Sequence, residues 1–327
     1  MVRPTTTAKG PHNLMSIRSL RTRLTAVLVA TVTAAGVAGV VTTAPAQARP
    51  ATAYVFSAAM GKNIPIKVLR AANGSNSAPT LYLLDGLRAP DNDNGWLINT
   101  DVVNYFANKN VNVVLPYGGA GTFYQDWQNR DPKLGTVKWE TFLTRELPAA
   151  MKARFGSDGR RNAIAGLSMS GTSALILATD HPSMYQGVAS FSGYPVSSEP
   201  GFAQGIGLSV AQIGGDINNM WGVWPGGQWL AKDPALHAGN LRGKRVYISA
   251  GLGGSNISPT ADPVKFAQFV PLETAAGIAS QQYIGTLRMN GINPVTHISQ
   301  EGTHWWTYWQ ARLKEAWVST LGPALGA

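Results

Sequence analysis

The chain contains no cysteine among its 327 residues. Disulfide bonds, a cysteine nucleophile and thiolate metal sites are therefore excluded. Charged residues are also scarce, at 13%, whereas hydrophobic residues make up 44%. This balance is unlike that of a disordered polyelectrolyte, and a chain of this length can bury a core without covalent cross-links. We expect neither a metal ion nor an organic cofactor.

Acidic residues are absent from positions 1–48, which carry five basic residues. Three arginines there precede an uncharged run at 24–41 that is rich in Ala, Val and Thr, and Ala-Gln-Ala at 46–48 supplies a cleavage pattern. These features are typical of a secretory signal peptide, so we expect 1–48 to be cleaved and the protein to be secreted or held in the cell envelope. The alternative is an uncleaved membrane anchor, which the Gly and Thr in the run disfavour.

Clusters of basic residues are lacking as well. The formal net charge is +10, and half of it lies in the first 48 residues. The rest of the chain does not interleave basic with aromatic residues, so we expect no nucleic-acid partner. The remaining charge is compatible with a weak attraction to an anionic envelope surface.

The region 49–327 shows no internal repeat and alternates short apolar runs with helical segments. This alternation predicts a single α/β domain with a mostly parallel central sheet and helices on both faces. Strands are expected at 53–58 and 64–69 (an opening hairpin), 80–84, 111–116, 161–167, 186–191, 245–250 and 294–299, with helices at 138–155 and 169–179.

The pattern fails between Gly193 and Asn240, which are separated by a stretch rich in Gly, Pro and Trp. A structureless loop of that length is uncommon inside a compact domain. We therefore expect a cap-like insertion at about 193–240 that contains short helices. Its apolar and Trp side chains are expected to cover the apolar side of a substrate pocket.

The sequence Gly-Leu-Ser-Met-Ser-Gly at 166–171 follows a predicted strand and opens a predicted helix. This is the context of a nucleophile elbow, in which a tight turn holds a serine hydroxyl out over the sheet edge of an α/β-hydrolase fold. The pattern departs from Gly-x-Ser-x-Gly, because Ser170 stands in place of the second glycine and Gly171 follows it. We predict Ser168 as the nucleophile; the alternative is an ordinary turn rich in Ser and Gly.

A serine hydroxyl needs a general base, and among the five histidines His304 is the best placed. It stands in a Gly-containing loop just after the last predicted strand, where this fold carries its base. The other four lie in the signal segment, at a helix end, in the insertion and on a strand (His12, His181, His237 and His297). The alternative for His304 is a surface-loop histidine.

Two carboxylates are candidates for the acid that orients the histidine. Asp262 lies in the loop after the strand predicted at 245–250. Glu273 is expected to begin a helix whose core face contains Leu272, Ala276, Ala279, Tyr283 and Leu287. A glutamate at a helix start often only complements the helix dipole. Position and residue type leave the two carboxylates equally supported.

Several sequence blocks resemble the antigen 85 family of mycolyltransferases, and together they span nearly the whole mature chain. The blocks are Leu-Tyr-Leu-Leu-Asp-Gly-Leu-Arg-Ala at 81–89, Asn-Gly-Trp at 94–96, Ile-Asn-Thr at 98–100, Phe-Tyr-Gln-Asp-Trp at 123–127, 138–143, 166–169, Met-Trp-Gly at 220–222 and 302–309. Trp305, Pro90 and Leu97 depart from the residues common in the family, which bears on acceptor preference. In the family the acid is a glutamate preceded by leucine, so the resemblance favours Glu273.

The resemblance also implies binding groups. The backbone N–H groups of Leu87 and Met169 would form the oxyanion hole. The sugar-binding site of the family carries over to a mixed set of donors and acceptors, Asp85, Arg88, Asn99 and Trp306. The alternative for Asp85 and Arg88 is a structural ion pair.

The function implied by the resemblance is exported acyl transfer. Ser168 would accept a mycolyl group from trehalose monomycolate and pass it to a second trehalose monomycolate or to cell-wall arabinan. The alternatives are a secreted carboxylesterase of the same fold and an envelope adhesin that binds an extracellular-matrix protein such as fibronectin. The expected partners are trehalose mycolates and cell-wall glycolipid, and we expect a monomer.

Overall fold

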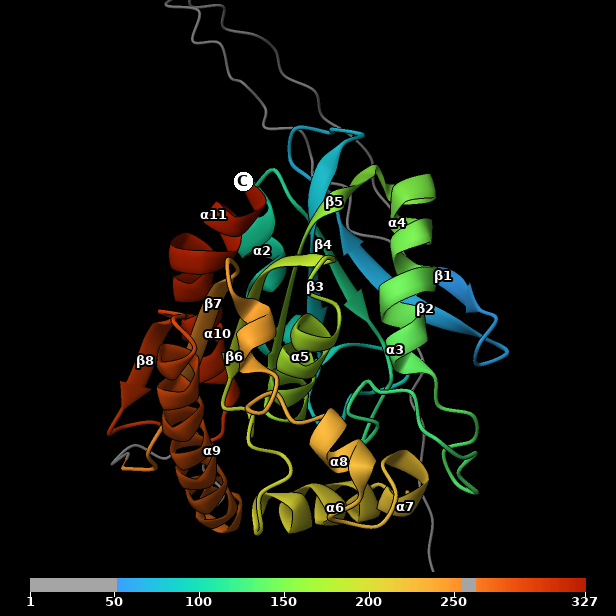
Figure 1. Ribbon diagram of the computed structural model, residues 1–327. Coiled ribbons are helices and arrows are strands. Elements are labelled where there is room, and N and C mark those ends of the chain that lie inside the picture. Colours follow the sequence, from blue (N-terminus) through green and yellow to red (C-terminus); the bar gives the residue numbers. More distant parts are fainter. Residues whose placement is uncertain (1–51, 255–262) are drawn as a thin grey trace, which may run out of the picture. The chain divides into compact units, whose positions relative to one another are not determined.

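One sheet with the strand order β1-β2-β4-β3-β5-β6-β7-β8 organises the part of the chain that the computed structural model describes, residues 52–254 and 263–327 (Figure 1). Side chains are described from residue 267 onward in the second range. The predicted signal segment and Asp262 lie outside the described residues. The strands are β1 (Thr52–Ser57), β2 (Lys62–Leu69), β3 (Ala78–Leu84), β4 (Asn112–Pro116), β5 (Ser157–Leu167), β6 (Tyr185–Phe191), β7 (Arg245–Gly251) and β8 (Val295–Ser299).

The sheet is mostly parallel, as predicted. β1 and β2 form the antiparallel hairpin, β2 also pairs antiparallel with β4, and the remaining neighbours run parallel. Every predicted strand is present, and β5 starts earlier than expected, at Ser157. Because parallel strands end at the same edge, the loops that follow β3, β5, β6, β7 and β8 gather there.

Helices cover both faces of the sheet, which confirms the expected fold class. Alternating side chains of β3 belong to two cores: Tyr82 lies in the core that includes residues of α4, α5 and α9, and Leu83 lies in the core that includes residues of α1, α2, α10 and α11. Within the described residues no helix has both the length and the apolar character needed to cross a bilayer. The helices that cover the two faces of the sheet are α1 (Gly95–Asn99), α2 (Val102–Phe106), α4 (Leu147–Phe155), α5 (Met169–Asp180), α9 (Pro263–Met289), α10 (Trp306–Ala316) and α11 (Gly322–Leu325).

The helix predicted at 138–155 is not a regular α-helix. It consists of α3 (Trp139–Thr141), a π-helical turn at Phe142–Glu146 and α4. The wide turn closes with the Leu147 N–H donating to the Phe142 carbonyl. Pro148 follows at once and has no N–H to continue the normal ladder, so the irregular turn falls where a regular one would lose a hydrogen bond anyway.

The prediction that Glu273 begins a helix is wrong, because α9 already starts at Pro263. Pro271 lies inside this helix without ending it. Four of the five predicted core positions of α9 are buried, but Leu272 is 45% exposed. Leu272, just before Glu273, therefore belongs to the helix but not to the core.

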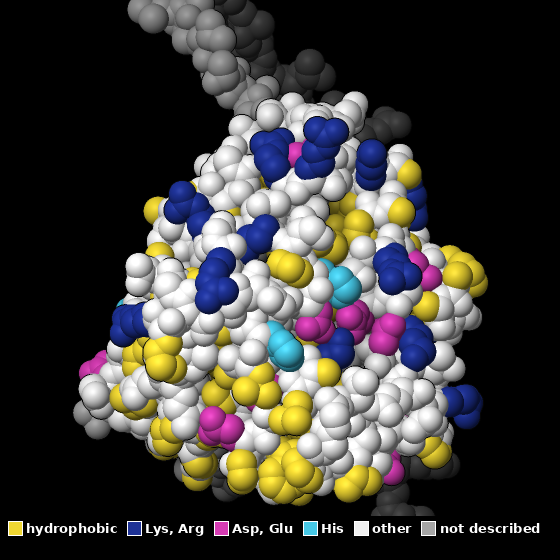
Figure 2. Space-filling view, viewed as in Figure 1, with side chains coloured by type: hydrophobic (Ala, Val, Ile, Leu, Met, Phe, Trp, Pro, Cys, Tyr) yellow, Lys and Arg dark blue, Asp and Glu magenta, His cyan; other side chains and the backbone are white. Residues whose placement is uncertain are grey.

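Residues 193–240 hold three short helices and no strand: α6 (Phe202–Gln212), α7 (Ile217–Met220) and α8 (Gly227–Ala231). A 3-10 turn at Ala238–Leu241 follows. In Figure 1 the three helices lie together at the lower end of the view, and in Figure 2 hydrophobic side chains gather along the same edge, while Lys and Arg side chains concentrate higher up. Exposed apolar residues of this stretch are Leu208, Val223, Leu230 and Leu236.

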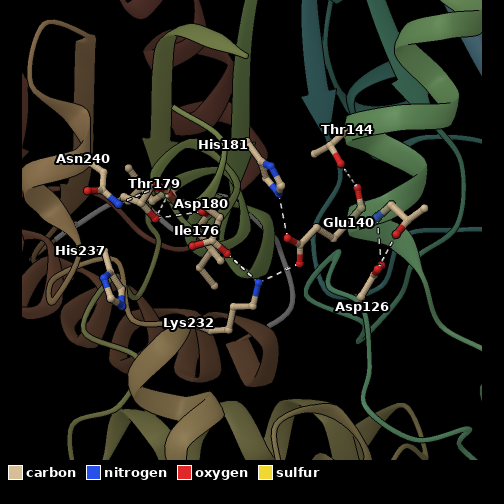
Figure 3. A network of polar contacts seen from close by, with 12 residues as sticks. Asp126, Glu140, Thr144, Ile176, Thr179, Asp180, His181, Lys232, His237 and Asn240 are labelled. Carbon is tan, nitrogen blue, oxygen red and sulfur yellow. Dashed lines mark hydrogen bonds and ion pairs between the residues drawn. The ribbon is translucent and has the colours of Figure 1, made fainter. Parts of the chain in front are cut away.

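A partly buried polar cluster connects this stretch to the sheet-covering helices (Figure 3). Lys232, just after α8, places its Nζ atom 2.9 Å from Glu140 Oε2 and 2.6 Å from Asp180 Oδ2. His181 contributes its Nε2 atom at 2.8 Å from Glu140 Oε1. The cluster therefore joins α3, the end of α5 and the segment after α8.

Candidate active site

Ser168 stands at the junction of β5 and α5 in a strained backbone conformation, with φ 54° and ψ −122°. Close packing around it requires glycine: a Cβ at Gly166 would lie 2.2 Å from the Ser170 carbonyl oxygen, and one at Gly171 would lie 2.9 Å from Ser190 Oγ. Strain of this kind persists where the surrounding structure enforces it, as in a nucleophile elbow.

Ser170, which replaces the second glycine of the usual pattern, is fully buried and stabilises the turn. Its Oγ accepts a hydrogen bond from the Leu167 N–H at 2.9 Å and lies 3.1 Å from the Leu84 carbonyl oxygen. The hydroxyl thus links the end of β5 to the end of β3. A serine is accommodated here because its hydroxyl finds partners on both strands.

His304 lies between Ser168 and Glu273 in space, on the loop between β8 and α10. Its Nε2 is 2.7 Å from Ser168 Oγ, and its Nδ1 is 2.8 Å from Glu273 Oε2. The imidazole is 7% exposed and packs edge-on against Trp309 with the ring centroids 5.0 Å apart. The three residues predicted from the sequence are therefore joined by two short contacts.

Glu273 is buried, and its second carboxylate oxygen is satisfied by neutral donors. Oε1 accepts hydrogen bonds from Ser192 Oγ at 2.8 Å and from the Gly251 N–H at 2.6 Å. Trp309 Nε1 in turn donates to Ser192 Oγ at 3.0 Å. The carboxylate thus has fixed partners on β7 and just after β6. These partners hold it so that Oε2 is directed toward His304.

Sequence reasoning missed Ser192 and Trp309. Ser192 directly follows β6 at the carboxyl edge of the sheet and has a positive φ of 52°. Its place after a predicted strand is the one signal that could have drawn attention to it. Trp309 lies one helical turn beyond Trp305 and Trp306, where it reads as an ordinary core residue.

A pocket of about 1060 Å³ lies over Ser168. Eight of the nine residues predicted for the site line it; Glu273 lies behind His304 and does not. Leu87 and Met169 are both part of the lining, and Met169 is the first residue of α5, whose first N–H groups have no acceptor within the helix. The pocket thus brings together Ser168, His304 and the two residues whose N–H groups are predicted to bind an oxyanion.

One side of the pocket carries polar groups. The Asp85 carboxylate accepts hydrogen bonds from the Gly86 and Gly95 N–H groups, and Asn99 Nδ2 donates to the Gly95 carbonyl at 2.8 Å. Burial raises the pKa of Asp85, and the two backbone hydrogen bonds partly oppose the rise. A Cβ at Gly95 would lie 2.5 Å from the Trp306 ring, so glycine lets the indole lie against this loop.

Asp85 and Arg88 do not form the structural ion pair considered as an alternative. The exposed Arg88 instead donates from Nη2 to Gln212 Oε1 on α6 at 3.3 Å. Because the carboxylate is held by backbone N–H groups, the guanidinium is left at the pocket wall with a neutral partner. The loop after β3 and α6 therefore touch across the pocket.

The opposite side is apolar, and only part of it was expected. As expected, apolar residues of the insertion line it, namely Phe202, Ile206 and Leu208 from α6. Phe269 and Leu272 from α9 line it as well. Trp221 and Trp229, which were expected on this side, are instead buried against each other with their ring centroids 5.0 Å apart. The α9 wall was missed because Leu272 was assigned to the core.

Among the described residues, no group of three or more His, Asp or Glu side chains could hold a metal ion. The polar groups around Ser168 are already engaged with one another, as the contacts of His304 and Glu273 show. The arrangement can deprotonate a serine hydroxyl, orient the base and stabilise an oxyanion with backbone donors, which are the requirements of acyl transfer.

Comparisons with known proteins agree with this geometry. The family described as Putative esterase matches residues 57–319. The diacylglycerol acyltransferase/mycolyltransferase Ag85A of Mycobacterium gordonae is 38% identical over 314 residues, covering 89% of this chain and 88% of the relative. Ag85B of Mycobacterium leprae is also 38% identical, over 84% of this chain and 86% of the relative.

Solved structures give the same fold. MPT51 (FbpC1) of Mycobacterium tuberculosis superposes with a TM-score of 0.72 at 27% identity, over 86% of this chain and 99% of that one. An S-formylglutathione hydrolase from Agrobacterium tumefaciens, at 16% identity and a TM-score of 0.63 over 84% and 95% of the two chains, shares the fold. The resemblance seen in the sequence blocks is therefore confirmed, and this chain belongs to the antigen 85 family of diacylglycerol acyltransferase/mycolyltransferases.

Proposed function

We propose that this protein is an exported acyltransferase that moves mycolyl groups through an acyl-enzyme on Ser168. The observation that carries the proposal is the contact chain Ser168–His304–Glu273, at 2.7 and 2.8 Å, beneath a pocket with one polar and one apolar wall. Membership of a family whose relatives are named acyltransferases and mycolyltransferases supports the same reaction class. The sequence features of residues 1–48 support export.

In the first half-reaction, His304 Nε2 takes the proton of Ser168 Oγ as the oxygen attacks the ester carbonyl of trehalose monomycolate. The carbonyl oxygen becomes an oxyanion, which accepts hydrogen bonds from the Leu87 and Met169 N–H groups. Each such donor contributes about 3 kcal/mol to lowering the barrier. When the intermediate collapses, His304 gives its proton to the departing sugar oxygen, and the mycolyl group remains on Ser168.

Glu273 keeps the imidazole oriented and stabilises its positive charge in both half-reactions. In the second half-reaction, a hydroxyl of another trehalose monomycolate or of cell-wall arabinan takes the place of the departed sugar. His304 removes its proton as the hydroxyl oxygen attacks the acyl carbonyl. When this second intermediate collapses, the bond to Ser168 Oγ breaks, the new ester leaves, and His304 returns the proton to Ser168 Oγ. The enzyme is then back in its starting state.

The two walls fit the two parts of the donor. Asp85, Arg88, Asn99 and Trp306 offer acceptors, donors and an aromatic face to a sugar. The α6 and α9 side chains cover the acyl chain, where each buried methylene contributes about 0.8 kcal/mol.

The test is incubation with trehalose monomycolate labelled in its acyl chain, followed by analysis of the lipid products. Wild-type protein is expected to yield trehalose dimycolate, and Ser168→Ala to yield none while also losing labelling by a serine-directed phosphonate. Ser209→Ala is a matched control, because Ser209 lines the pocket but bonds only to its own helix. Release of free mycolic acid alone would indicate a carboxylesterase instead, and equal labelling of wild type and Ser168→Ala would exclude the nucleophile.

A further inference from the structure

Four non-glycine residues of the described chain have a positive φ: Phe123, Tyr124, Ser168 and Ser192. Ser168 and Ser192 belong to the contact chain of the active site. The other two are consecutive, aromatic and buried, each with φ 52°. Bulky residues rarely adopt this conformation, and when they do the strain is enforced by neighbours and commonly lies at a functional site.

The two strained residues point in different directions. Phe123 lines the pocket over Ser168. The Tyr124 ring turns inward and packs edge-on against Trp139, with the centroids 5.3 Å apart. The left-handed pair thus places one ring in the pocket wall and the next beneath the loop that follows β3.

The Tyr124 hydroxyl uses both its donor and its acceptor capacity. It donates to the Gly118 carbonyl at 3.1 Å and accepts from the Asp85 N–H at 3.3 Å. By contrast, the Tyr185 hydroxyl, which is equally buried, has no hydrogen-bond partner. The hydroxyl of Tyr124 therefore connects the loop after β4 to the loop after β3.

Two backbone contacts complete this connection. The Gly121 N–H donates to the Leu87 carbonyl at 3.1 Å, and the Gly118 N–H donates to the Pro90 carbonyl at 2.8 Å. Along the chain, the hydrogen bond of the Asp85 N–H comes just before the Leu87 N–H, and the hydrogen bond to the Leu87 carbonyl comes just after it. That N–H is the donor assigned above to the oxyanion.

We propose that Tyr124 is a positioning residue that fixes the Leu87 N–H for the oxyanion, through its hydroxyl contact with the Asp85 N–H. The proposal rests on the proposed function. An oxyanion donor is effective because its place is fixed before the reaction, so loosening the loop weakens transition-state binding more than substrate binding.

The test compares Tyr124→Phe with Tyr185→Phe. The second variant removes a hydroxyl of equal burial at the amino end of β6, whereas the pocket lies at the carboxyl ends of the strands. With a p-nitrophenyl ester, Tyr124→Phe is expected to lower kcat about tenfold and to leave KM within about twofold. The inhibition constant of phenylboronic acid, which forms a tetrahedral adduct on the serine, should rise in parallel. Hydrogen exchange of the peptide that contains residues 85–87 should accelerate. Tyr185→Phe should change none of these.

The inference is overturned if kcat and the boronic acid constant of Tyr124→Phe match those of the wild type. It is also overturned if Tyr124→Phe and Tyr185→Phe lose activity together with thermal stability, because the hydroxyl would then be only structural. Failure of the proposed function is recognised separately, since Ser168→Ala would then retain phosphonate labelling whatever the behaviour of Tyr124→Phe.

Discussion

Two His–Glu pairs of the described residues have the same contact distance, one of them buried and the other partly exposed. His304 Nδ1 lies 2.8 Å from Glu273, and His181 Nε2 lies 2.8 Å from Glu140. The first pair stands at the carboxyl edge of the sheet beneath the pocket, and the second joins helices (Figure 3). A short His–Glu contact is therefore not by itself a sign of catalysis.

The surroundings of the two carboxylates separate the pairs. Glu140 also meets the charged Lys232; burial acts to raise its pKa, but the His181 hydrogen bond and the lysine hold the pKa at about 2. Among the described residues, the hydrogen-bond partners of Glu273 besides His304 are the neutral Ser192 hydroxyl and Gly251 N–H. A carboxylate already neutralised by lysine has less to offer an imidazolium, whereas Glu273 is free to stabilise one.

The largest difference between the pairs should appear when both glutamates are changed to glutamine. Glu273→Gln is expected to lower kcat by about 10³-fold, because the imidazole loses its orienting charge. Glu140→Gln should leave kcat within about twofold. Steady-state kinetics on one ester substrate measures both, with Asp262→Asn as a third variant that should stay near wild type. A larger loss in Asp262→Asn than in Glu273→Gln would transfer the role of the acid to Asp262.

The second pair should instead matter for stability. Lys232→Met leaves Glu140 and Asp180 without their cation, so the free energy of unfolding should fall by about 2–3 kcal/mol. Lys314→Met is the matched control, since Lys314 forms an exposed pair with Asp101, and its loss should cost less than about 0.5 kcal/mol. Urea denaturation measures both values. Equal losses in the two variants would mean that the partly buried cluster contributes no more than a surface pair.

The same cluster should make stability depend on pH. The pKa of Glu140 is about 2 in the folded protein, below its usual 4.5. A lowered pKa contributes stability that is complete above about pH 5 and is lost as the pH falls through 4.5 toward 2. Wild type should therefore exceed Glu140→Gln by about 2 kcal/mol at pH 7, and the gap should shrink by pH 3. Denaturation curves at pH 7, 5 and 3 test this; a constant gap would contradict it.

The smallest effect concerns the pocket rather than either pair. Arg88→Ala is expected to lower kcat/KM about fivefold for donors that carry trehalose and to leave p-nitrophenyl esters unaffected, because one hydrogen-bonding group to the sugar is lost. Gln212→Ala removes only the partner of Arg88 on α6 and serves as control. A parallel fall on both substrate types would make Arg88 structural.

The sequence was most informative where one short segment fixes both structure and chemistry. The turn at Ser168 could be predicted because a strand, small residues and a helix follow one another within a few positions. The hairpin, the parallel strands and the helix after Ser168 could also be predicted from short local sequence patterns. His304 could be predicted because it follows the last strand in a loop that contains glycine.

Other features depend on contacts between distant segments and left weaker signals. Ser192 supports Glu273 only because β6, β7 and α9 meet in space. The sequence around Ser192 does not indicate that these elements meet. Leu272 has the spacing of a core residue, yet it faces the pocket because α9 extends past the sheet edge. The strained backbone of Tyr124 is likewise enforced by tertiary packing that overrides local preference.

Gly95 shapes the polar side of the pocket because it has no side chain. Even a single methyl group at this position would occupy space held by the Trp306 ring and by Asp85 Oδ1, at 2.5 and 2.6 Å. The indole and the carboxylate therefore both lie close to the Gly95 backbone, in space that a side chain would otherwise fill. Under the proposed function, a larger residue at this position would be expected to change sugar selectivity without itself touching the ligand, so redesign of the acceptor site would begin there.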